Sequence, residues 1–166
     1  GVHDANFVHP LGDELVTNGS FDTDSDWNLN GWNISGGSAN NDGINTGNIN
    51  QDIGLQQNKF YKISINITNY VSGALKVRLG TGNQIAVGSS NGGYILYLEN
   101  TTTNPNIRLY PDASLNFQGS IDSVSAKEML VNRESTATNT GIVERPITGV
   151  NESDPMFPDN TISTII

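Results

Sequence analysis

Residues 60–68 read FYKISINIT, and the spacing of their apolar residues determines the class of fold. Apolar and polar residues alternate along this stretch, and in an extended chain the apolar side chains then all point to one face. These apolar residues are Tyr61, Ile63, Ile65 and Ile67. The period of two predicts a β-strand with one buried face.

The same alternation recurs on both sides of this stretch. Further strands are expected at residues 14–16, 32–34, 48–53, 74–79, 83–87, 94–99, 106–110 and 117–127. In the last of these the apolar beat slips between Ile121 and Val124, which predicts a β-bulge near Asp122–Ser123. Many short strands separated by Gly, Asn and Ser turns predict an all-β fold, an antiparallel β-sandwich.

The composition narrows the classes of function. The 18 glycines and the abundance of Asn, Ser and Thr disfavour long helices. A net charge of −9 argues against nucleic-acid binding, which needs a basic surface. The absence of cysteine excludes disulfides, thiolate metal sites and a cysteine nucleophile. No apolar run reaches the roughly 20 residues of a membrane helix, so no membrane insertion is expected.

The texture of the sequence divides the chain into three segments. Residues 1–12 form a short N-terminal arm without periodicity, and residues 13–129 contain the predicted sandwich. Residues 130–166 hold Pro146, Pro155 and Pro158 among scattered apolar residues without a stable period. We therefore expect one folded domain with extended arms at both ends.

An ordered series of short motifs runs through residues 13–128. It opens with LVTNGSFD at 15–22 and continues through GWNISGG at 31–37 and KFYKIS at 59–64 to GSIDSVS at 119–125. As a series it resembles the carbohydrate-binding modules of families four and nine. The resemblance implies a β-jelly roll that binds glycans in a cleft lined by aromatic residues. The motif series is also similar to domains of tailed-phage virion proteins, where the module is an appendage rather than part of an enzyme.

The resemblance also implies a structural calcium ion, with ligands at Asn18, Asp22 and Asp122. The acidic string DTDSD, which starts at Asp22, has the spacing of half an EF-hand loop. Trp27 and Asn33 stand where that loop requires Gly and Glu, so an EF-hand is excluded. Oxygen ligands suit calcium, and residues 1–58 contain several acids and no Lys or Arg. The alternative is a solvated acidic turn.

Five basic and aromatic residues of the predicted strands form the candidate glycan-binding face: Lys76, Arg78, Tyr97, Arg108 and Tyr110. An aromatic ring offers flat apolar area to a sugar ring. The alternative is a polar outer face or a contact with a partner. Trp27 and Trp32 are expected in the core or at its edge.

The C-terminal segment, residues 130–166, is richer in apolar residues than a solvated linker. Its prolines disfavour a packed helix, so we expect it to lie extended across a neighbouring subunit. That subunit is either another copy of the chain or another virion protein. Met156 and Phe157 are the expected anchors, and the contact includes Ile165 and Ile166 at the C-terminal end.

These observations lead to a non-enzymatic function. His3 and His9 are the only histidines and lie in the N-terminal arm, so the predicted sandwich has no Ser-His-Asp triad. We expect a structural protein on the outer surface of a tailed-phage virion, a capsid decoration or tail appendage able to bind host or environmental glycans. The alternative is a free-standing carbohydrate-binding module.

Overall fold

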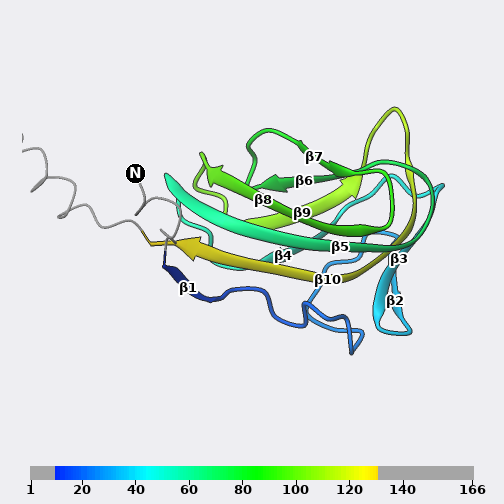
Figure 1. Ribbon diagram of the computed structural model, residues 1–166, viewed down its shortest axis with the longest axis horizontal. Helices are drawn as coiled ribbons and strands as arrows, with labels where there is room; N and C mark the ends of the chain where they lie inside the picture. Colours follow the sequence, from blue (N-terminus) through cyan, green and yellow to red (C-terminus); the bar gives the residue numbers. More distant parts are fainter. Residues whose placement is uncertain (1–9, 131–166) are drawn as a thin grey trace, which may run out of the picture. The chain divides into compact units, whose positions relative to one another are not determined.

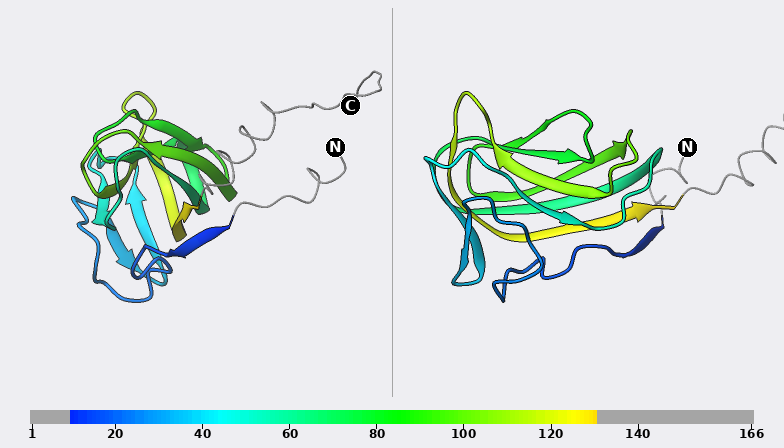
Figure 2. Two further views of the ribbon diagram at one scale, coloured as in Figure 1. Left: turned by 90° about the vertical axis from the view of Figure 1, so that its left-hand side faces the viewer. Right: turned by 180° about the vertical axis from the view of Figure 1, so that it is seen from behind.

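The computed structural model describes residues 10–130, which form two antiparallel β-sheets and, within that range, no helix (Figure 1). The strands are β1 (Leu11–Glu14), β2 (Asn33–Ser35), β3 (Ser38–Asp42), β4 (Ile49–Asp52), β5 (Lys59–Gly73), β6 (Leu75–Leu79), β7 (Ile85–Gly88), β8 (Gly92–Asn100), β9 (Asn106–Pro111) and β10 (Phe117–Met129). The two sheets lie face to face as a β-sandwich (Figure 2). This confirms the all-β, antiparallel class predicted from the sequence. None of these residues belongs to a helix that could cross a membrane.

Each sheet has a simple strand order. The six-stranded sheet runs β2-β3-β10-β5-β8, and β1 also pairs with β10. The four-stranded sheet runs β4-β9-β6-β7. The chain therefore crosses between the sheets several times, and β5 and β6, neighbours in sequence, lie in different sheets.

β5 lies inside the six-stranded sheet, between β10 and β8. Its alternation is the one seen in the sequence, because Tyr61, Ile63, Ile65 and Ile67 are each at most 1% exposed. Along β10 the pairing with β5 shifts between Ile121 and Ser123. This confirms the predicted bulge near Asp122.

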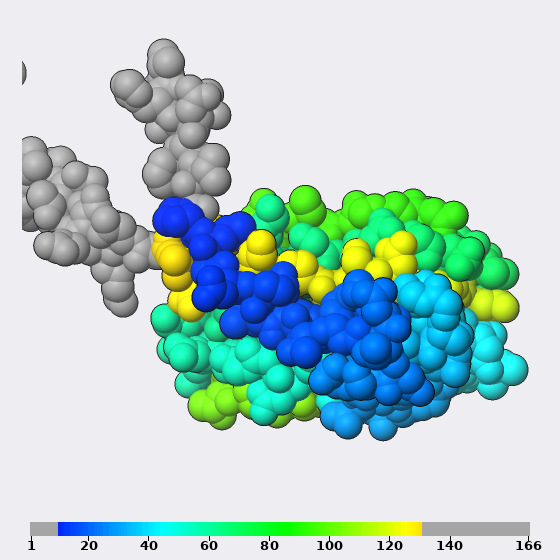
Figure 3. Space-filling model, turned by 90° about the horizontal axis from the view of Figure 1, so that it is seen from below, coloured from blue at the N-terminus to red at the C-terminus, as the bar shows by residue number. Residues whose placement is uncertain are grey.

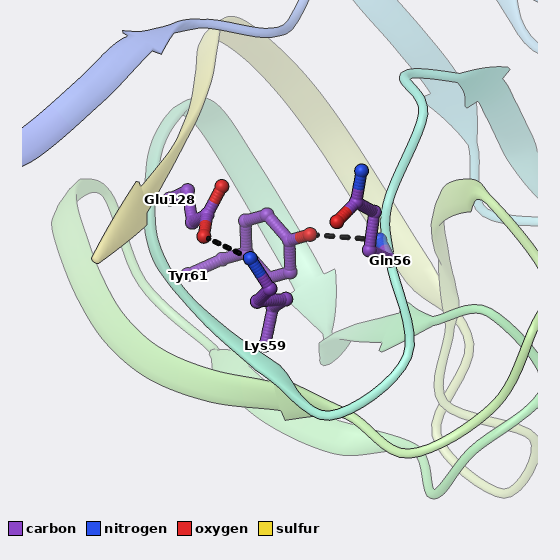
Figure 4. A network of polar contacts seen from close by, with 4 residues as sticks. All are labelled: Gln56, Lys59, Tyr61 and Glu128. Atoms are coloured by element: carbon purple, nitrogen blue, oxygen red, sulfur yellow. Dashed lines mark hydrogen bonds and ion pairs between the residues drawn. The ribbon is translucent and has the colours of Figure 1, made fainter. Parts of the chain in front are cut away.

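Two polar contacts hold the first residues of β5 in place (Figure 4). The hydroxyl of buried Tyr61 accepts the backbone N–H of Gln56 at 2.8 Å, so this polar atom has a partner. Lys59 forms an ion pair with Glu128 of β10 at 2.9 Å. The ion pair is partly exposed and contributes at most about 1 kcal/mol. The buried tyrosine hydrogen bond is therefore the more important of the two contacts.

The core between the sheets combines aliphatic and aromatic side chains. The four-stranded sheet contributes Leu75, Val77, Leu79, Ile107 and Leu109, none more than 4% exposed. At one end the rings of Trp32 and Phe117 stack with their centroids 6.0 Å apart.

The indole N–H groups of both tryptophans have partners. Trp32 donates its indole N–H to the Gly47 carbonyl at 2.8 Å, and Trp27 donates its own to the Asn18 carbonyl at 3.0 Å. Both side chains are buried, Trp32 at 3% exposed and Trp27 at 7%. The expectation that the two tryptophans belong to the core is confirmed.

The segment that follows β1 runs beside β10 on the outside of the sandwich (Figure 3). The Leu15 N–H bonds to the Ala126 carbonyl at 3.0 Å, and the Val124 N–H bonds to the Gly19 carbonyl at 2.9 Å. These bonds continue the ladder that β1 begins on β10. The N-terminal segment is therefore held against the last strand of the sandwich.

The arms predicted at the two ends lie almost entirely outside the described residues. One part of the prediction is wrong: Leu11 and Gly12, assigned to the N-terminal arm, belong to β1. Leu11 pairs with Met129 of β10, and the Leu130 N–H bonds to the Pro10 carbonyl at 2.9 Å. Because LGDE has no marked alternation of apolar and polar residues, its pairing with β10 could not be predicted from local pattern.

Ile65→Ala tests the role assigned to β5. Because Ile65 is 1% exposed, its truncation should lower the free energy of unfolding by about 2–5 kcal/mol, the usual cost of a cavity in a packed core. Val71→Ala is the matched control on the same strand, since Val71 is 63% exposed and should change stability by about 0.5 kcal/mol or less. Urea denaturation measures both. Equal effects of the two variants would contradict the assignment.

Candidate functional site

The outer face of the four-stranded sheet gathers four of the five predicted glycan-binding residues. On β6 and β9 the apolar side chains point into the core, so the residues between them face outward. Lys76 of β6 lies opposite Tyr110 of β9, and Arg78 lies opposite Arg108. We call these four residues the basic face.

Tyr97, the fifth predicted residue, does not belong to this face. It lies on β8 in the six-stranded sheet, opposite Lys62 of β5, and is 59% exposed. Its neighbours Leu96 and Leu98 pack against the core, so Tyr97 points to the outside of that sheet. The grouping of Tyr97 with the other four is therefore wrong, because alternation shows which residues share a face of one strand but not which sheet the strand joins.

The charge of Lys76 is compensated within the protein. Its ammonium group lies 3.2 Å from the carboxylate of Asp112, which follows β9 directly. Hydrogen bonds from the Ser114 hydroxyl and backbone N–H, and then the bond from Lys76, lower the pKa of Asp112 from 3.8 to about 2. Asp112 is therefore ionised at neutral pH and holds Lys76 at the rim of the basic face.

The two arginines face each other across the strand pair without an ion pair to an acidic residue in the described part of the chain. Arg78 donates from Nε to the Gly82 carbonyl at 2.7 Å and from its terminal nitrogen to the Thr81 carbonyl at 3.0 Å. These bonds turn Arg78 toward the β6–β7 turn. Directly opposed like charges destabilise a sheet, so an anion bound here would be favourable.

Two buried polar atoms of the basic face lack a hydrogen-bond partner among residues 10–130. They are Nε of Arg108 and the hydroxyl of Tyr110, two residues apart on the same side of β9. A buried polar group without a partner costs free energy, and such groups are rare in native proteins. Because both atoms are buried, a ligand would reach this N–H donor and this hydroxyl only after neighbouring side chains move.

A row of asparagines borders the arginines on the side of β4. Asn50 lies opposite Arg108, and its side-chain oxygen accepts bonds from Asn28 at 3.1 Å and Asn106 at 3.4 Å. Amide groups can donate to and accept from sugar hydroxyls. Sequence alternation puts Asn50 on the outer face of its strand with Asp52. It does not show that this strand lies beside β9, and Asn50 was therefore not predicted as a site residue.

The contacts of Asn18 do not fit the calcium ligand that the resemblance implies. Its carbonyl oxygen accepts the Phe21 N–H at 3.2 Å and the Trp27 indole N–H at 3.0 Å, so both lone pairs are used. Its side-chain oxygen accepts the Asp22 N–H at 3.0 Å. Asn18 organises the acidic turn, with a positive φ of 52°.

The other two predicted ligands each have a partner in the protein. Asp22 accepts a bond from the Ser20 hydroxyl at 2.7 Å, and Asp122 accepts one from the Asn66 side chain at 2.6 Å. Among residues 10–130, no three Asp, Glu or His side chains gather closely enough to hold a metal ion. Calcium at Asp22 and Asp122 stays a prediction.

A buried glutamine that was not among the predicted site residues connects the four-stranded sheet to the segment after β1. Gln51 of β4 accepts the Thr17 N–H at 2.8 Å and donates to the carbonyls of Thr17 at 2.9 Å and Asp26 at 3.1 Å. Its side chain therefore substitutes for a strand partner and holds the acidic turn against the four-stranded sheet. The sequence signal was its phase, because Gln51 shares the inward-facing positions of the strand with the apolar Ile49 and Ile53.

The predicted partner contacts cannot be placed on this surface. Met156, Phe157, Ile165 and Ile166 lie outside the described residues. Comparisons with known proteins add no assignment: no family model matches the chain, and no match was found among the curated proteins.

Asp112→Asn tests the electrostatics at the rim. Since the folded-state pKa of Asp112 lies below 3.8, its carboxylate stabilises the fold above about pH 4, and this contribution is lost as the pH falls toward 2. The variant should be less stable than the wild type at neutral pH, and the difference should shrink in acid. Urea midpoints measured across this range check the expectation.

The control for this experiment is Asp24→Asn, which removes an exposed carboxylate from the acidic turn. Asp24 has no ion pair among the described residues, so this variant should show no comparable loss of stability at neutral pH. If Asp112→Asn keeps the same deficit at every pH, the carboxylate of Asp112 does not act as described.

Proposed function

We propose that the protein is a non-enzymatic structural protein of a tailed-phage virion. In this proposal the sandwich is a jelly roll that decorates the outer surface of the capsid or tail and binds glycans with acidic groups. The virion setting and the jelly roll rest on the motif series in residues 13–128. The binding function rests on the basic face.

The observation that carries the binding function is the state of Arg78, Arg108 and Tyr110. Two arginines stand opposite each other in an acidic protein, and the Arg108 Nε and Tyr110 hydroxyl have no partner in residues 10–130. A carboxylate or sulfate group would accept from the guanidinium and relieve the repulsion between the arginines. A sugar ring would bring hydroxyls for the neighbouring asparagines and an apolar face for Tyr110. Acidic polysaccharides combine these features.

The free-standing carbohydrate-binding module remains the second candidate, and the same basic face favours it. The two candidates differ in location rather than in surface chemistry. If the chain is a decoration protein, antibodies against it should label intact phage particles, and electron microscopy should show the label on their surface. Particles without label, together with a soluble protein that still binds glycans, would favour the free module.

Arg108→Gln and Tyr110→Phe test the binding face. A uronic-acid polymer such as polygalacturonate is the probe, with uncharged dextran beside it and titration calorimetry as the measurement. Loss of the charge-assisted bond to Arg108 is worth about 1.5–3 kcal/mol, which corresponds to a loss of affinity of roughly tenfold or more. Tyr110→Phe removes a buried hydroxyl that lacks a partner, so it should weaken binding without lowering the melting temperature.

Tyr97→Phe is the matched control, because it removes the same hydroxyl from the outer face of the other sheet. It should leave affinity unchanged. Binding should also weaken as salt is added, since the interaction is between charges near the surface. Equal affinity for polygalacturonate and dextran, or equal loss from Tyr97→Phe and Tyr110→Phe, would contradict the proposed face.

A further inference from the structure

β8 is an open edge of the six-stranded sheet. It pairs with β5 along its whole length, from Asn100 opposite Lys59 to Gly92 opposite Ile67, without a register shift. No other strand of residues 10–130 pairs with its second side (Figure 1). In an antiparallel strand about half of the backbone N–H and C=O groups point away from a single neighbour. Within residues 10–130, β8 therefore presents a row of backbone groups that have no strand partner.

The other edges of the two sheets are protected in ways that β8 is not. Natural edge strands are kept short, bulged, or marked with Lys or Pro so that they do not pair with other chains. β1, β2, β4 and β7 have three or four residues each, and the pairings of β1 and β7 contain register shifts. β8 has nine residues, GGYILYLEN, with no Lys, no Pro and one charge at Glu99.

The side chains of β8 are apolar on both faces. Ile95 and Tyr97 point outward and are 58% and 59% exposed. On the inner face Tyr94, Leu96 and Leu98 are only partly buried against the core. An exposed edge with apolar side chains on both faces is a site for strand pairing.

We propose that β8 pairs antiparallel with β8 of a second copy, about a two-fold axis at Leu96, so that the two six-stranded sheets become continuous. Leu96 is the middle residue of Gly92–Asn100, and only this register pairs all nine residues. It places Ile95 opposite Tyr97 of the second copy, and Tyr97 opposite Ile95. The four exposed side chains then form one apolar cluster on the outer face.

The charge pattern favours a second copy as the occupant. In this register Glu99 lies opposite Gly93 of the second copy, so the two glutamates are at opposite ends of the interface and no like charges meet. The strand is thus complementary to itself, as a two-fold interface requires. This inference does not depend on the proposed glycan function, because the basic face lies on the other sheet.

Tyr97→Lys in the full-length chain tests the interface. Sedimentation equilibrium should give twice the chain mass for the wild type, and the chain mass for the variant at the same concentration, because an edge lysine blocks pairing. Ile44→Lys is the control: it replaces an 81% exposed side chain outside β8 and should leave the dimer intact. A cooperative melting transition and a β-type circular-dichroism spectrum show that both variants fold. A monomeric wild type, or a dimer that survives Tyr97→Lys, would overturn the proposal.

A single cysteine tests the register, since the chain has none of its own. With the axis at Leu96, Leu96→Cys brings its two thiols together, and mild oxidation should give a disulfide-linked dimer on a non-reducing gel. Ile44→Cys should not cross-link at the same rate. Slow hydrogen exchange in β8 of a monomer would mean that another segment or partner covers the edge, and this result also contradicts the proposal.

Discussion

The pairing of β5 with β10 organises the whole sandwich. These are the two longest strands, of 15 and 13 residues, and every other strand of the six-stranded sheet attaches to one of them or to β3. β8 attaches to β5, whereas β1 and β3 attach to successive parts of β10. The four-stranded sheet then packs against the buried face of β5.

The basic face is a consequence of this packing. Once the apolar residues of β6 and β9 face the core, the residues between them have to point outward. Pairing of the two strands then places Arg78 opposite Arg108. Like charges at opposite positions destabilise a sheet. Asp112 compensates Lys76 but lies beyond the end of β9, so the arginine pair keeps its charge. In the described part of the chain, no acidic side chain forms an ion pair with either arginine.

The fold was largely predictable because period-two alternation is a local property. The inward positions of β5, β6 and β9 and the bulge at Asp122 followed directly from it. β3 was not predicted because SANND has a single apolar residue, Ala39. The second buried position of this strand is occupied by the polar Asn41, so no alternation of apolar and polar residues is visible. The wrong placement of Tyr97 has a different cause: the pairing of strands far apart in the sequence is decided by the whole core rather than by local pattern.

The many asparagines also acquire a physical role in the structure. Among the described residues, most non-glycine positions with positive φ are Asn: Asn18, Asn30, Asn58, Asn69 and Asn116. Asparagine tolerates this left-handed backbone better than other residues with a side chain. Others bond to nearby backbone, as buried Asn100 does to the Asn104 carbonyl at 3.2 Å. The composition indicated turns, but it did not show which asparagines adopt the left-handed conformation, because that depends on the strands they connect.

Native-state hydrogen exchange is the most direct measurement of whether β5 and β10 support the rest of the sandwich. Amides in the β5–β10 ladder should exchange most slowly, and their opening free energy should equal the free energy of global unfolding. The amides of β6 and β9 should open at the same or a lower free energy. If β6 and β9 stay protected while the β5–β10 ladder exchanges through a local opening, the four-stranded sheet is the stable unit and the account is contradicted.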